Sequence, residues 1–150
     1  MNMTNKRCGE CGAKGFVQKN VRGLWRHPWK DYPSVHLTRD LELWVCQECG
    51  NTASTVGDAQ KTDAAIEASI RDQTSQFLDI IKSKSGLKFE EIATRLGVDP
   101  SWISSLRSQR ATPSFHLWNL LKVTAIDPKV MTERLDPSFD IVGNNVLLRA

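Results

Sequence analysis

FEEIATRLGVDPSWISSLRS, residues 89–108 of the 150-residue chain, has the pattern of two short helices joined by a tight turn. A helix-turn-helix needs a small residue where its helices approach, a glycine in the turn, and an aliphatic residue that packs the second helix on the first. Ala93, Gly97 and Ile103 occupy these positions. Asp99-Pro100 joins a favoured N-cap residue to a favoured first helical residue, so the second helix begins there. The stretch therefore predicts a helix-turn-helix.

If the second helix enters a DNA major groove, the residues that it does not use for packing must face the bases. The expected packing residues are Ile92, Leu96, Val98 and Leu106. The expected base-facing residues are Asp99, Ser101, Trp102, Ser104 and Ser105. The expected phosphate contacts are Lys88, Arg107, Ser108, Arg110 and Thr112. Each Lys or Arg alone fits a solvated surface charge equally well, but residues 82–115 hold six basic and three acidic side chains, which favours DNA.

All four cysteines lie in two Cys-x-x-Cys pairs, Cys8 with Cys11 and Cys46 with Cys49, and a glycine follows each pair. This spacing lets both thiolates of a pair face one ion, and two pairs form a closed tetrahedral site without room for a bound water. We therefore expect one structural Zn²⁺ per chain. An iron–sulfur cluster is an alternative, since four cysteines also hold such clusters. A reducing compartment disfavours a disulfide, and neither pair opens a helix as a thioredoxin-like site does.

The 34 residues between Cys11 and Cys46 must carry structure of their own. Apolar residues alternate over residues 15–23, 34–37 and 40–46, which predicts short strands. The aromatic and basic loop between the first two strands is the candidate surface for a protein partner, with contact residues Trp25, His27, Trp29 and Tyr32. Trp25 and Trp44 fit equally well inside a small metal-stapled core. His27 and His36 are alternative metal ligands, but the four thiolates suffice without them.

Helical periodicity appears only after Asn51, with apolar residues at Ile66, Ile70, Phe77 and Ile81. Further helices are expected over residues 113–123 and from Pro128, the second with Val130, Met131 and Leu135. Residues 139–148 read as two strands around a Gly-Asn-Asn turn. The predicted fold is α+β, with a small zinc-stapled β-rich module before an all-α domain of about five helices. The expected segments are the zinc-binding β module at 1–57, a linker helix at 58–73, the helix-turn-helix domain at 74–135 and a hairpin tail at 136–150.

Composition narrows the class of protein. With 20 basic and 17 acidic residues the chain is not a strongly basic coat protein, and 40% hydrophobic with 25% charged residues is typical of a globular chain. No apolar run approaches the roughly 20 residues that span a bilayer, and no signal-peptide pattern follows the N-terminus, so we expect a cytoplasmic protein without a membrane role. We expect no enzymatic activity, because there is no Ser/His/Asp grouping, glycine-rich phosphate loop or open metal site.

The order of these motifs resembles the MqsA-type antitoxins over nearly the whole chain. The cysteine set at positions 8, 11, 46 and 49 and the run from Ile92 to Pro113 carry the resemblance. It implies a homodimer that binds a small ribonuclease toxin through its zinc module and represses its own operon at a palindromic double-stranded DNA operator. The sequence departs from that family at Ser101 and Ser105, where the family can carry Asn and Arg for base contacts, and in a tail that extends past Leu135.

Two functions are therefore weighed. The first is a DNA-binding transcriptional repressor that serves as the antitoxin of a type II toxin–antitoxin pair. The second is a stand-alone regulator of a phage or mobile element, with a structural zinc module and no toxin partner. A neighbouring gene for a small basic ribonuclease would favour the first.

Overall fold

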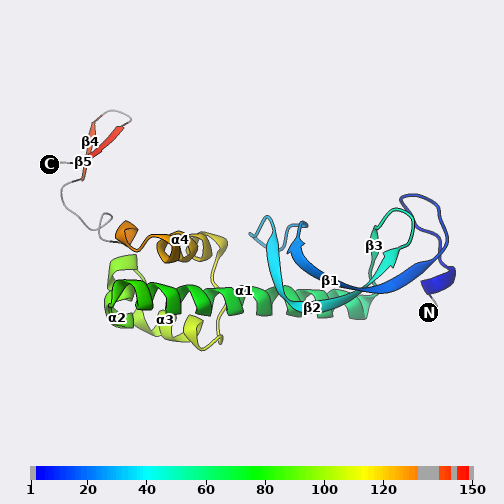
Figure 1. The fold of residues 1–150 in the computed structure, drawn as a ribbon, viewed down its shortest axis with the longest axis horizontal. Helices are drawn as coiled ribbons and strands as arrows, with labels where there is room; N and C mark the ends of the chain where they lie inside the picture. The colour runs from blue at the N-terminus through cyan, green and yellow to red at the C-terminus, as the bar shows by residue number, and fades with distance from the viewer. Residues whose placement is uncertain (1–2, 132–138, 143–144, 149–150) are drawn as a thin grey trace. The chain divides into compact units, whose positions relative to one another are not determined.

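The computed structural model describes residues 3–131, 139–142 and 145–148, and it divides into two compact units between Gln73 and Thr74 (Figure 1). The first unit contains a three-stranded antiparallel sheet and the first part of helix α1. The second unit contains the rest of α1 and the helices that follow it. This arrangement confirms the α+β class, with the sheet before the helices.

The sheet of the first unit has the order β1-β2-β3. Its strands are β1 (Phe16–Trp25), β2 (Val35–Cys46) and β3 (Thr52–Ala53), and a single 3-10 turn, η1 (Met3–Asn5), precedes them. Phe16 pairs with Cys46 and Trp25 with Val35, so β1 and β2 form a long hairpin. A register shift between Val21 and Gly23 interrupts this pairing.

The separate strands expected over residues 34–37 and 40–46 are one strand, β2. The buried residues Val35, Leu37, Leu41, Leu43 and Val45 all occupy odd positions, so one face of a single strand contains them all. Arg39 lies at the odd position that breaks the apolar pattern, and its guanidinium forms two hydrogen bonds of 3.1 Å with the carboxylate of Asp72. An ion pair with the helix therefore replaces apolar packing at this position.

Helix α1 spans Val56–Ser85, so the expected linker helix over 58–73 is only its first part. Its start is capped reciprocally, because the hydroxyl of Thr55 donates to the carboxylate of Asp58 and the amide of Asp58 donates to that hydroxyl. Ile66 and Ile70 are buried in the first unit. Ser69, also buried, accepts a 3.0 Å hydrogen bond from the amide of Thr38 in β2. These contacts hold the first part of α1 against the sheet.

The second unit has its own apolar core. It contains the C-terminal part of α1, then α2 (Phe89–Leu96), α3 (Pro100–Arg107) and α4 (Phe115–Ile126), and residues 129–131 are again helical. The core residues are Leu78, Ile81, Ile92, Ala93, Ile103, Leu106, Leu121, Ala125 and Met131. Within this unit α2 and α3 lie on one side of α1 and α4 on the other (Figure 1). Among the residues that the structure describes, no helix combines the length and the apolar character needed to cross a membrane.

The tail contains two paired strands, β4 (Phe139–Val142) and β5 (Asn145–Leu148), which are antiparallel as expected. The residues expected at the tip of this hairpin, Gly143 and Asn144, lie outside the described residues, as does Leu135.

Candidate metal centre and candidate nucleic-acid interface

The four cysteines converge on one point of the first unit. Their Sγ atoms all lie within 4.8 Å of one another, and the Sγ–Sγ distances from Cys8 to Cys49 and from Cys11 to Cys46 are both 3.6 Å. An ion bound tetrahedrally with Zn–S bonds of 2.3 Å holds its sulfurs about 3.8 Å apart. The donor set and its spacing therefore fit a single tetrahedral ion. A disulfide does not fit these distances, because its sulfurs lie only about 2.05 Å apart.

The two Cys-x-x-Cys turns have the same backbone geometry. The amide of Gly12 donates to the carbonyl of Cys8 and that of Gly50 to the carbonyl of Cys46, over 2.9 and 3.0 Å. Both glycines have a positive φ, 72° and 73°, which residues with a Cβ adopt only with strain. The amides of Cys8 and Cys46 donate to residues five positions along, over 2.8 Å in each case. Backbone hydrogen bonds thus hold each pair in a closed turn.

Backbone hydrogen bonds favour the ionised form of the cysteine thiols. Hydrogen bonds from the amides of Cys11 and Glu10 lower the pKa of the Cys8 thiol to about 6, and amides of Cys49 and Glu48 lower the pKa of Cys46. Amide hydrogen bonds also favour the thiolates of Cys11 and Cys49, but desolvation together with the sulfurs of Cys8 and Cys46, and for Cys49 also that of Cys11, raises both pKa values. Four thiolates at this spacing repel one another, so a cation is required to keep all four ionised.

The histidines do not belong to this cluster. Among the described residues, the group that could hold a metal consists of the four cysteines, without His27 or His36. Both histidines are exposed, His27 beside the ring of Trp25 and His36 in β2.

The turn between α2 and α3 matches the sequence prediction residue by residue. Gly97 has a φ of 67°, its amide donates to the carbonyl of Thr94, and the amide of Val98 donates to that of Ala93. The carboxylate of Asp99 then accepts the amide of Ser101 at 2.7 Å and caps α3. These hydrogen bonds end one helix and start the next within three residues.

The outer surface of α3 is polar and exposed, whereas Ile103 and Leu106 on its inner side are buried. Ser101, Trp102 and Ser104 are exposed, with 40% of the Trp102 surface accessible, and Ser105 is half-buried. The serine hydroxyls already donate within the protein: Ser101 to the Asp99 carboxylate, Ser105 to the Ser101 carbonyl, and Ser108 to the Ser104 carbonyl. Because the hydrogens of these three hydroxyls are used within the protein, their oxygens can only accept hydrogen bonds from a partner.

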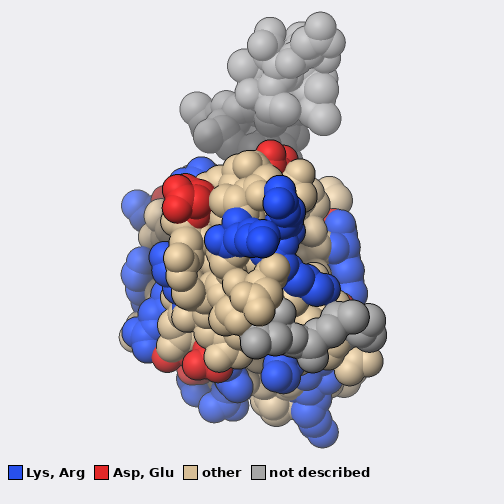
Figure 2. All heavy atoms as spheres, turned by 90° about the vertical axis from the view of Figure 1, so that its right-hand side faces the viewer, with Lys and Arg blue, Asp and Glu red and all other residues tan. Residues whose placement is uncertain are grey.

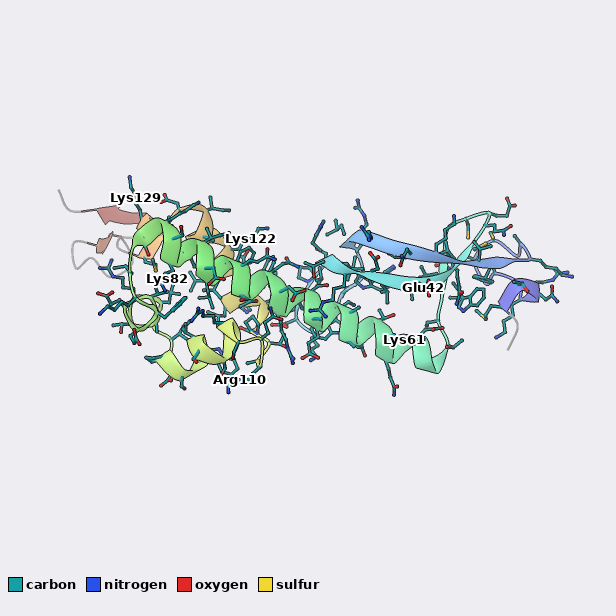
Figure 3. The ribbon with its side chains drawn as sticks, turned by 60° about the horizontal axis from the view of Figure 1, so that its bottom comes forward. Glu42, Lys61, Lys82, Arg110, Lys122 and Lys129 are labelled. Carbon is teal, nitrogen blue, oxygen red and sulfur yellow. The ribbon has the colours of Figure 1, made fainter. Side chains whose placement is uncertain are left out.

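The cations expected at phosphates have different surroundings. Lys88 precedes α2 and is exposed. Arg107 lies 4.5 Å from the ring centre of Phe89 and 3.8 Å from an oxygen of Asp79, so its guanidinium is partly engaged. Arg110 donates to the hydroxyl of Ser108 at 2.9 Å and lies on the α3 side of the second unit (Figure 3). Thr112 is half-buried.

Two further lysines of the second unit lie away from α3. Lys122 and Lys129 are on the α4 side, opposite Arg110 (Figure 3). On the first unit, which faces the viewer in Figure 2, Lys and Arg side chains are likewise separated by uncharged residues and by acidic ones. Because cations lie on both the α3 side and the α4 side of the second unit, charge alone does not mark an interface there, and the α3 surface is distinguished by its exposed side chains.

The predicted aromatic contact surface needs correction. Trp29 and Tyr32 are buried, with 9% and 2% of their surfaces accessible. The expected contact surface therefore does not include these two side chains. The Trp29 indole donates to the carboxylate of Asp63 in α1 at 2.9 Å, and the backbone amides and carbonyls of Trp29 and Tyr32 pair with each other. Burial also raises the pKa of Tyr32. The loop thus folds onto the helix because Asp63 offers the indole a hydrogen-bond acceptor.

Trp25 is half-buried and His27 is exposed, and both line a cavity of about 390 Å³ in the first unit. Leu43 and residues 51–54 of the sheet side, with Ala59, Thr62 and Asp63 of α1, complete its lining. The sequence prediction missed Asp63, because only the packing of α1 on the sheet brings this residue to the aromatic loop. Comparison with protein-family models and with curated proteins found no match for this chain, so its function is inferred from the geometry of these sites.

Proposed function

We propose that this protein is a DNA-binding transcriptional repressor that serves as the antitoxin of a toxin–antitoxin pair. The observation that carries the DNA-binding part is the α2–α3 pair, in which a left-handed Gly97 and the Asp99 cap join two eight-residue helices. The inner side of α3 is buried, and its outer side offers serines and Trp102 to a partner. A helix with this division of residues suits insertion into a major groove.

The proposal includes a homodimer. One eight-residue helix contacts too few base pairs to be specific alone. Two copies related by a two-fold axis would read two half-sites about 34 Å apart, so the proposed operator is a palindrome.

The proposed ion of the cysteine cluster is Zn²⁺ in a structural role in a cytoplasmic protein. Its support is the four-thiolate donor set and the 3.6 Å sulfur spacing, which suits one ion, whereas a cluster of several irons would hold the sulfurs further apart. When bound, the ion would offset half of the charge of the four thiolates and tie the segment before β1 to the end of β2.

DNA binding is tested by incubating the tagged full-length protein with fragments of its source genome and sequencing the fragments that it retains. We expect enrichment of a few fragments that share an inverted repeat with half-sites about 10 base pairs apart. The affinity for such a fragment should fall steeply as salt rises. Retention of no fragment above background would contradict the proposal.

Two variants connect this binding to α3. Arg110→Ala should weaken binding to all sequences and lower the salt slope of the dimer by about 2, because each of its two protomers loses one phosphate contact. Lys129→Ala removes the same charge on the α4 side and should leave both quantities unchanged (Figure 3). Equal effects of the two variants would count against α3 as the DNA-binding surface.

The antitoxin role is tested by co-purification from the native operon with metal analysis of the same sample. A stoichiometric small ribonuclease with about one zinc per chain is the expected result. Zinc and operator DNA without a protein partner would instead favour the stand-alone regulator.

A further inference from the structure

The cavity in the first unit lies apart from both proposed sites, because neither a cysteine nor a residue of α3 lines it. Its volume of about 390 Å³ falls within the range of about 300–1,000 Å³ typical of ligand sites. The sheet supplies one side through Trp25, Leu43 and the β3 residues, and α1 supplies the other through Ala59, Thr62 and Asp63. The cavity is therefore bounded by elements that pack on each other within one unit.

The lining has one carboxylate, that of Asp63, and no Lys or Arg. One oxygen of this carboxylate accepts the Trp29 indole at 2.9 Å, which fixes the side chain and leaves the other oxygen for a ligand. The fixed carboxylate gives the cavity a negative charge in the absence of a ligand. The charge favours a cation over an anion or an apolar group.

The other residues that line the cavity favour a planar cation over a compact one. Trp25 presents an aromatic ring held edge to face against His27, with centroids 5.2 Å apart. Aromatic rings attract cations, and a planar guanidinium stacks on an indole better than a compact ammonium does. Asn51, Thr52 and Ser54, whose side chains carry hydrogen-bond acceptors, also line the cavity, and several acceptors suit the several N–H donors of a guanidinium.

We propose that this cavity binds the guanidinium of an arginine side chain presented by a partner protein, with Asp63 as the ion-pairing residue and Trp25 as the stacking residue. The inference refines the partner surface of the proposed function. Its test uses neither DNA nor the toxin, so that failure of one proposal is distinguishable from failure of the other.

The test is a titration of the full-length ¹⁵N-labelled protein with the capped tripeptide acetyl-Gly-Arg-Gly-amide, followed through the indole N–H signals by NMR. We expect saturable shifts of the Trp25 indole signal. The same peptide with citrulline in place of arginine has nearly the same shape without the charge, and it should not bind.

Two variants separate the cavity from general surface charge. Asp63→Asn keeps an acceptor for the Trp29 indole but removes the carboxylate, and it should weaken peptide binding about tenfold. Glu67→Gln removes the same charge one helical turn further along α1, outside the lining, and should leave binding unchanged. Unchanged amide signals of the β1–β2 hairpin near Phe16 and Cys46 in Asp63→Asn would show that the unit stays folded.

Four outcomes would overturn the inference. Equal binding of the citrulline peptide would remove the role of the charge, and equal weakening by both variants would remove the role of the cavity. Free arginine that bound more tightly than the capped peptide would assign the site to a small molecule instead of a protein segment. Absence of any shift at about 20 mM peptide, well above the millimolar range of weak single-residue contacts, would show that the cavity does not bind this group.

Discussion

Gly97 joins α2 to α3 with a φ of 67°, and a Cβ built on it would meet no atom within 4 Å. Any cost of a side chain here therefore comes from the backbone conformation and not from a clash. We predict that Gly97→Ala lowers the free energy of unfolding by about 1–2 kcal/mol, the usual cost of a left-handed conformation. Asn adopts this conformation more readily, so Gly97→Asn should lose less. Urea unfolding of both variants tests the difference, and equal losses would contradict the explanation.

Asp99 caps α3, and its hydrogen bonds from the hydroxyl and the amide of Ser101 lower its pKa below the ordinary 3.8. A lowered folded-state pKa means that the cap stabilises fully above the unfolded-state value and is lost as pH falls through the folded-state value. We predict that Asp99→Ala lowers Tm by a few degrees at neutral pH, while Asp99→Asn, which also caps, stays close to the wild type.

The same comparison of variants at acidic pH distinguishes the effect of the Asp99 charge from the effect of its capping hydrogen bonds. Thermal unfolding followed by circular dichroism should show the wild type losing its advantage over Asp99→Ala below about pH 3.8, whereas Asp99→Asn keeps its advantage. A constant difference between wild type and Asp99→Ala across this range would refute the assignment of the lowered pKa to the cap.

At the scale of elements, Ile103 connects α3 to the core of the second unit and has only 1% of its surface accessible. We predict that Ile103→Ala lowers the free energy of unfolding by about 2–5 kcal/mol, and Ile103→Val by about 0.5–1.5 kcal/mol, because the cost follows the volume of the cavity created. Urea unfolding measures both. A loss below 1 kcal/mol in Ile103→Ala would mean that α3 is not anchored through this residue.

Strand β2 shows how far an element can be predicted from its sequence. The alternation of apolar and polar residues predicted a strand at each end of β2. Thr38 and Arg39 interrupt the apolar pattern, which suggested two separate strands. In the structure these two residues bind Asp72, through a 2.8 Å hydrogen bond from the Thr38 hydroxyl and the ion pair of Arg39. The partner lies 33 residues further along the chain from Arg39, so local periodicity could not reveal that the strand continues.

At the scale of the whole molecule, the metal cluster and the core of the first unit share residues. Cys8 and Cys46 are themselves buried beside Met3 and Phe16, whereas the core of the second unit contains no cysteine among its described members. We predict that a strong zinc chelator, or Cys46→Ser, destabilises the sheet and leaves α2, α3 and α4 folded.

Hydrogen exchange resolved by residue measures this difference. Amides of the β1–β2 hairpin near Phe16 and Cys46 should lose protection after chelation, while amides of the second unit retain it. Equal loss of protection in α4 would show that the two units unfold as one.

The sequence by itself determined the features that depend on neighbouring residues: the cysteine pairs with their glycines, the α2–α3 turn with its cap, and the buried face of α3. Each follows from hydrogen bonds and periodicity over a few positions, so no distant contact was needed. The tertiary structure confirmed the expected convergence of the two cysteine pairs, and it alone decided the course of β2 and the burial of Trp29. These depend on partners more than 30 residues away, such as Asp63 for Trp29, whose positions are set by packing and not by local preference.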